Sequence, residues 1–227
     1  EQGINSVAEL VARDPKHLRQ GYGVVIERIA HELRGTPCDA LQPVAATKQQ
    51  IVCSRSFGEH ITDKHTMQQA LGGFMTRAAE KLRGEGMCCR HVTVFIRTSP
   101  FNKNRPCYSN QVSTTLTVPT QDTRALLATI NDLLPRIWRE QQPFQKGGVM
   151  LADFSPANLQ QADLFACELQ SLRSQALMTV IDRINQGRLG KVYFAGRGCT
   201  PSDWMMKREQ ASPRYTTALD ELPVAKA

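Results

Sequence analysis

The middle of the chain changes between two hydrophobic periods, and this alternation limits the possible folds more than any other feature. Three segments place an apolar residue at every second position, which is typical of half-buried strands: residues 49–57, 90–98 and 111–118. Two segments have helical spacing, residues 63–84 and 122–137, the second with a bend expected at Pro135. Residues 147–153 form a last strand. The predicted order is therefore βαββαβ.

This order is the ferredoxin-like split βαβ pattern of the α+β class, in which both helices cover one face of an antiparallel sheet. The opposite face is predicted to be open and lined by His91, Thr93, Arg97, Gln111, Ser113, Thr115 and Thr117. Lys103 and Arg105 follow in the connection between the two middle strands. Such a face suits phosphates and sugars, although any solvated strand face is polar. Phe95 alone offers a ring there, so the pattern disfavours a protein that stacks single-stranded bases.

The flanking segments differ from this central pattern. Residues 1–46 predict two short helices around a hairpin, with Gly21 and Gly23 at the start of the second helix. Backbone N–H groups at such a helix start can approach a phosphate, but two glycines can equally well serve only a tight turn. After residue 156 the pattern lapses, and residues 176–185 and 192–195 predict a helix and a strand in a small C-terminal α/β tail.

Charge and composition indicate which kinds of partner the chain can bind. The chain of 227 residues has a net charge of +7, and residues 47–156 carry 14 basic and 8 acidic side chains, a net charge of +6. This excess makes the segment a candidate for nucleic-acid binding, although it is also compatible with an ordinary solvated surface. No apolar core of a signal peptide lies near residue 1 and no apolar run reaches about 20 residues, which predicts a cytoplasmic chain that does not enter a membrane.

Catalytic motifs are not found in the sequence. The seven cysteines contain no C-x-x-C pair, the five histidines are isolated, and the acidic residues are scattered. Neither a Gly-rich phosphate loop of the Walker type nor a G-x-S-x-G motif is present. The sequence therefore predicts no catalytic residue and no metal ligand.

Four stretches resemble the UmuC-type translesion DNA polymerases of the Y-family, the catalytic subunit type of polymerase V. They are TKQQIVCSRSFG at residues 47–58, RAAEKLR at 77–83, KGGVML at 146–151, and the end segment MKR at 206–208 through SPRYTT at 212–217. The resemblance implies a helical thumb remnant over residues 1–46 and a little-finger domain over 47–156. It also implies a linker over 157–173 and a UmuC-type C-terminal domain over 174–227.

In this family the metal-binding carboxylates and the nucleotide contacts lie in a palm domain that does not match any part of this sequence. The resemblance therefore implies no cofactor in this chain, with Mg²⁺ expected for the missing palm. We expect the chain by itself not to incorporate nucleotides. Whether it is a recorded fragment of a polymerase or a natural truncation stays open, and so does its status as an enzyme.

The resemblance also implies partners. The little finger of the family lies along duplex DNA and contacts its phosphates, so the expected DNA contacts are Gly21, Gly23, Lys48, Arg55, Arg97, Lys103 and Arg105. Gln161, Leu164 and Phe165 match the Q-x-x-L-F peptide that binds the sliding clamp, unless Leu164 and Phe165 only pack the linker onto the domain. A UmuD-type accessory subunit and the recombinase filament of the SOS response are further implied partners.

One alternative from another class stays open. The βαββαβ fold also serves non-enzymatic regulatory or assembly modules that bind a small molecule or a protein. Such a module has no need for a basic excess or for the segment around Gln161. Binding to random duplex DNA distinguishes the two hypotheses.

Overall fold

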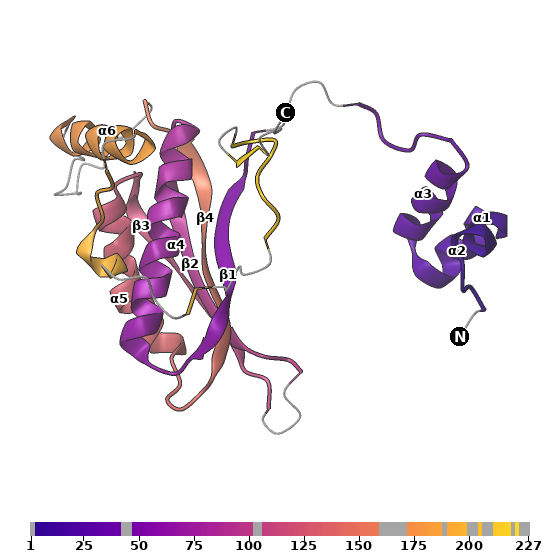
Figure 1. Cartoon of the computed structure of the whole chain (residues 1–227), viewed down its shortest axis with the longest axis horizontal. Helices are drawn as coiled ribbons and strands as arrows, with labels where there is room; N and C mark the ends of the chain where they lie inside the picture. Colours follow the sequence, from indigo (N-terminus) through magenta and orange to yellow (C-terminus); the bar gives the residue numbers. More distant parts are fainter. Residues whose placement is uncertain are drawn as a thin grey trace, which may run out of the picture. The chain divides into compact units, whose positions relative to one another are not determined.

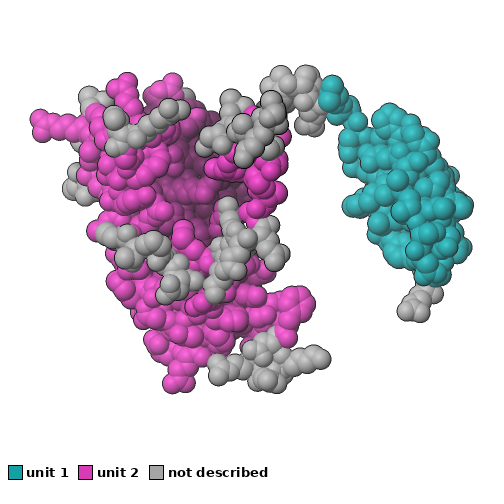
Figure 2. Space-filling view, in the orientation of Figure 1, with its two compact units in different colours: residues 1–47 teal, residues 48–227 magenta. Residues whose placement is uncertain are grey.

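The computed structural model describes residues 3–41, 47–101, 106–158, 172–187, 190–198, 204–205, 211–218 and 221–222. The chain divides into two compact units, Glu1–Thr47 and Lys48–Ala227 (Figure 2). Within the described residues, no helix has the length and apolar character needed to cross a membrane.

The first unit consists of three short helices, α1 (Val7–Ala12), α2 (Pro15–Tyr22) and α3 (Val24–Leu33) (Figure 1). The sequence predicted two helices, and the prediction was wrong because α2 is a separate helix. Asp14 caps α2 by accepting a hydrogen bond from the Lys16 amide at 3.0 Å, and Pro15 occupies its first position. Gly23 ends α2 with a positive φ of 87° and directly begins α3.

The second unit is built on a four-stranded antiparallel sheet of β1 (Gln50–Ile61), β2 (Met87–Thr98), β3 (Ser109–Thr120) and β4 (Phe144–Pro156). The strand order is β1-β4-β2-β3, so β4 and β2 are the central strands. Helices α4 (Lys64–Gly84) and α5 (Thr123–Ile137) cover the same face of this sheet (Figure 1). The predicted α+β class and the βαββαβ order of elements are confirmed.

The core lies between the sheet and these two helices. The alternation in β2 puts Val92, Val94 and Ile96 against the helices, where all three are fully buried. Val149 and Leu151 of β4 also point toward the helices and are fully buried. Because successive side chains point to opposite faces, the residues between them lie on the other face of the sheet. The alternation in the sequence therefore assigns the two faces of β2.

The C-terminal region packs on the helices of this unit. Helix α6 (Leu172–Gln186) lies at the end of α4 and α5 (Figure 1), and a short 3₁₀ helix, η1 (Ala195–Arg197), follows. The strand predicted for residues 192–195 is not formed. The Asn185 side chain accepts a hydrogen bond from the Val192 amide at 2.7 Å and donates to its carbonyl at 3.0 Å. This side-chain amide replaces the strand partner that the prediction required.

Candidate nucleic-acid interface

The open face of the sheet is organised in rows of paired residues. From β1 through β4 and β2 to β3, three rows are Gln50, Ala152, His91 and Thr115; Val52, Met150, Thr93 and Ser113; Ser54, Gly148, Phe95 and Gln111. A fourth row is Ser56, Lys146, Arg97 and Ser109. These rows include all the predicted lining residues except Thr117, which is exposed on β3 beyond the last of these pairs.

Hydroxyl groups connect the two strands at one side of this face. The Thr93 and Ser113 hydroxyls lie 2.9 Å apart, and His91 Nδ1 lies 3.4 Å from the Thr115 hydroxyl oxygen. Ser113 and Thr115 are nevertheless exposed, so each keeps capacity for a further hydrogen bond. This part of the face can therefore present neutral donors and acceptors to a ligand.

Phe95 and Gly148 shape the middle of the face. A Cβ atom added at Gly148 would lie 2.6 Å from the Phe95 ring and 2.3 Å from the Ser54 Cβ atom. The ring therefore reaches across Gly148 on β4 toward β1. Only a residue without a side chain leaves room for this position of the ring. Gly148 was not among the residues predicted to line this face.

Two cations stand side by side at one end of the open face. Arg97 on β2 is exposed, and its register partner on β4 is Lys146, which is half-buried. Among the described residues, neither side chain has a carboxylate partner within salt-bridge distance. Ser109 completes this end on β3 as the register partner of Arg97. The pair can attract an anion of the size of a phosphate.

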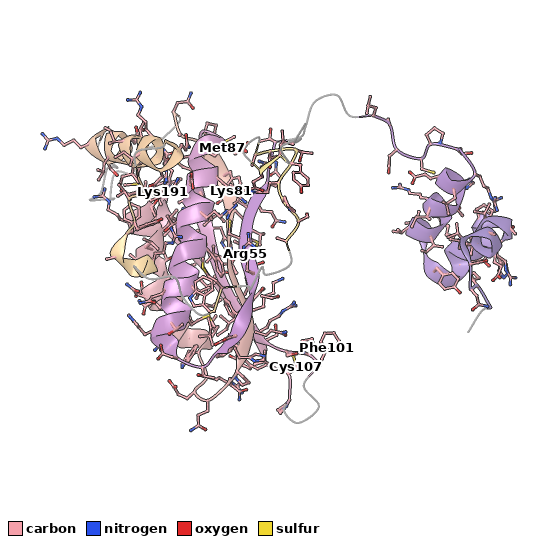
Figure 3. The ribbon with its side chains drawn as sticks, viewed as in Figure 1. Arg55, Lys81, Met87, Phe101, Cys107 and Lys191 are labelled. Carbon is pink, nitrogen blue, oxygen red and sulfur yellow. The ribbon has the colours of Figure 1, made fainter. Side chains whose placement is uncertain are left out.

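Arg55 lies on the other face of β1, the face that carries the helices. It follows the buried Cys53 at the two-residue spacing of that face, and its charge, with those of Lys81 and Arg77 of α4, acts on the Cys53 thiol. Figure 3 labels Arg55 and Lys81 on these neighbouring elements. Burial raises the pKa of Cys53 although the three cations oppose this shift. The structure therefore does not bring Arg55 together with Arg97.

The other expected contacts are divided among several places. Lys48 precedes β1 and forms an ion pair with Glu85 at the end of α4. Gly21 lies in α2 and Gly23 at the start of α3, both in the first unit. Five expected residues lie outside the described residues: Lys103, Arg105, Gln161, Leu164 and Phe165.

A metal site is not formed by the part of the chain that the structure describes. No group of three or more His, Cys, Asp or Glu side chains is placed there to hold an ion. The open face therefore provides binding groups, namely two cations, hydroxyls and one ring, rather than a set of metal ligands.

Two family models and several known proteins match this chain. The model of the impB/mucB/samB family C-terminal domain matches residues 48–164, and the model of a domain of unknown function, DUF4113, matches residues 175–225. Protein ImpB of Salmonella typhimurium is 48% identical over 225 residues, which cover 99% of this chain and 53% of that protein.

Two further relatives extend the comparison. Protein UmuC of Salmonella typhimurium strain LT2 is 44% identical over 221 residues, which cover 97% of this chain and 52% of that protein. DNA polymerase IV of Caulobacter vibrioides is 29% identical over 194 residues, which cover 84% of this chain and 44% of that protein. The chain thus spans about half the length of the curated relatives it matches. The resemblance noted in the sequence is confirmed: the chain belongs to the impB/mucB/samB family and carries the C-terminal domain of that family.

Proposed function

We propose that this chain is the damaged-DNA-binding portion of an error-prone translesion DNA polymerase of the SOS response. It holds primer-template DNA through phosphate contacts on the open face of the sheet. The observation that carries the proposal is the register pair of Arg97 and Lys146, which has no described carboxylate partner. The polymerase relative supports the choice of DNA over other polyanions.

The chemistry of the face favours contact with the DNA backbone over reading of bases. Ser113 and Thr115 offer exposed hydroxyls, which bind phosphate oxygens as well as base edges. The Phe95 ring reaches across Gly148 and is half-buried, so it is a poor platform for stacking an unpaired base. A protein that must accept any template needs affinity without sequence preference, which phosphate contacts provide.

Salt dependence tests the electrostatic part of the proposal. If the chain neutralises about three to five phosphates, the logarithm of the binding constant should fall with the logarithm of salt concentration with a slope of about −3 to −4.5. The double variant Arg97→Ala, Lys146→Ala should make that slope shallower by about 2. It should also weaken binding to all duplex sequences equally. Fluorescence anisotropy with random duplexes at several salt concentrations measures both effects.

Arg77→Ala is the matched control, because Arg77 is an exposed cation on α4, away from the open face. It should change the slope little. An equal loss in the control would mean that net charge, rather than the open face, governs binding. A slope near zero in the unmodified chain would exclude the phosphate mechanism and favour the regulatory or assembly module.

We also propose that residues 161–165 tether the chain to the sliding clamp. The Gln161 amide would bind at the rim of a pocket on the clamp, and Leu164 and Phe165 would fill the apolar floor of that pocket. Burial of these two side chains contributes about 3–6 kcal/mol before ordering costs, which by itself corresponds to a dissociation constant between about 6 mM and about 40 μM. A second attachment through DNA makes such a weak contact effective. The UmuD-type accessory subunit and the recombinase filament are further partners in this proposal.

A peptide of residues 157–170 titrated against the clamp in a calorimeter tests the tether. The double change Leu164→Ala, Phe165→Ala should abolish measurable binding, while Leu169→Ala in the same peptide should leave it nearly unchanged. Equal binding by the three peptides would refute the tether. In the full chain, a lower Tm of the double variant would favour packing of the two side chains onto the domain.

A further inference from the structure

Helix α4 contains two consecutive glycines in its interior, Gly72 and Gly73, which weaken a helix by backbone entropy. The C-terminal region explains the first of them. A Cβ atom added at Gly72 would lie 2.5 Å from the Gly196 carbonyl oxygen, whereas one added at Gly73 would only touch the Arg197 side chain at 3.6 Å. The backbone of η1 thus crosses α4 at Gly72 at a distance that no other residue permits.

A second contact lies farther along the chain, at Trp204. The Trp204 ring packs edge-on against Phe57 and Phe74, with ring centroids 5.8 and 5.9 Å apart. The Gly58 amide of β1 donates to the Trp204 carbonyl at 2.9 Å. Among the described residues, the buried indole Nε1 has no hydrogen-bond partner. An unpartnered buried donor weakens this contact and makes its release less costly.

A third contact anchors α6. Asp182 receives two hydrogen bonds from Arg83 of α4, at 2.6 and 2.7 Å, and both side chains are mostly buried. Arg83 also donates to the Gln121 carbonyl at 2.8 Å and to the Thr123 hydroxyl at 2.9 Å. Met178 of α6 is buried as well. The buried Met178 and Ile181 side chains and the bidentate ion pair of Asp182 therefore hold helix α6.

The start of α6 joins the same end of the helices. The Ser174 hydroxyl donates to Asp122, which caps α5, and accepts a hydrogen bond from Arg124 at 3.0 Å. Burial works to raise the pKa of Asp122, but its hydrogen bonds from Arg124 and Ser174 outweigh this and lower the pKa. The carboxylate is thus ionised at neutral pH and able to hold Ser174.

We propose that α6, residues 190–198 and Trp204 act together as an internal strap, which docks on α4, α5 and the end of β1 and can leave them as one unit while the sheet stays folded. The partner of the helical face is thus this chain's own C-terminal region, the part matched by the domain of unknown function. The strap contacts the sheet domain in three ways: the η1 backbone crosses α4 at Gly72, the Trp204 ring packs on two phenylalanines, and Asp182 pairs with Arg83. The inference does not depend on DNA or clamp binding.

A single tryptophan can report the state of the strap. The chain has two tryptophans, so Trp138→Phe leaves Trp204 as the only indole, and this variant serves as the reference protein. In it, Gly72→Ala should shift the Trp204 emission to longer wavelength and speed hydrogen exchange of α6 amides by about tenfold, because the methyl group displaces η1. Gly73→Ala is the control and should change neither quantity.

A second pair of variants tests the ionic anchor. Asp182→Asn should speed exchange in α6 by about 100-fold, since it leaves the Arg83 charge buried without its partner. Glu221→Gln makes the same chemical change in another arginine–carboxylate pair, in which Nε and Nη2 of the exposed Arg214 both donate to Glu221 Oε1, and it should leave α6 unchanged. In both test variants, exchange in β2 and β4 should stay at the reference rate.

Two results would overturn the strap. In the first, the Trp204 emission and the hydrogen exchange of the α6 amides are the same in Gly72→Ala and Asp182→Asn as in their control variants. In the second, β2 and β4 lose protection to the same extent as α6, which means that the C-terminal region and the sheet unfold as one body. Hydrogen exchange resolved by mass spectrometry separates both results from the expected one.

Discussion

Phe144→Ala should lower the free energy of unfolding by about 3–5 kcal/mol, the usual range for removing a fully buried phenylalanine. Phe144 is completely buried at the start of β4 and packs against Trp138 and Tyr108, with ring centroids 4.9 and 6.1 Å away. The vacated space cannot close without moving both rings. Chemical denaturation followed by circular dichroism measures the loss.

Phe101→Ala is the matched control for this change. Phe101 follows β2, is 88% exposed and points away from the sheet domain (Figure 3), so its removal should alter stability by less than about 0.5 kcal/mol. Phe144 is also the register partner of Thr98, next to the pair of Arg97 and Lys146. A loss below about 1 kcal/mol for Phe144→Ala would show that the aromatic cluster is not a main support of this end of the sheet.

Gly148→Val should destabilise the protein by about 3 kcal/mol and weaken DNA binding as well. The new Cβ atom would lie 2.3 Å from the Ser54 Cβ atom, 2.6 Å from the Phe95 ring and 2.9 Å from the Cys53 carbonyl oxygen. Two of these neighbours are backbone or Cβ atoms, which cannot turn away as the end of a flexible side chain can. The sheet must therefore separate locally, and Phe95 must leave its position across β4.

Ala152→Val on the same strand and the same face is the control, and it should change stability little because valine favours strands. Thermal unfolding compares the two variants, and duplex binding is measured below the lower Tm. If Gly148→Val is as stable as Ala152→Val, the Phe95 ring does not need the space over Gly148.

The open face shows how far strand alternation carries a site prediction. In β2 the alternation is regular, and Arg97 was predicted on the face where the structure has it. Lys146 was missed because the expected strand began at residue 147, where glycines interrupt the pattern. Counting back from Met150 in steps of two leads to Gly148 and Lys146, so the signal was present in the sequence. The same count from Ile51 and Cys53 places Arg55 on the helical face.

The sequence by itself determined the βαββαβ order of the sheet domain, the faces of β2 and the family, because hydrophobic period and short motifs are local properties of the chain. The order β1-β4-β2-β3 and the pairing of Arg97 with Lys146 were decided only by the tertiary structure. The role of Gly72 was decided in the same way, since the residue that needs its missing side chain is Gly196, far along the chain. Contacts between distant segments depend on packing and long-range pairing, which no local pattern records.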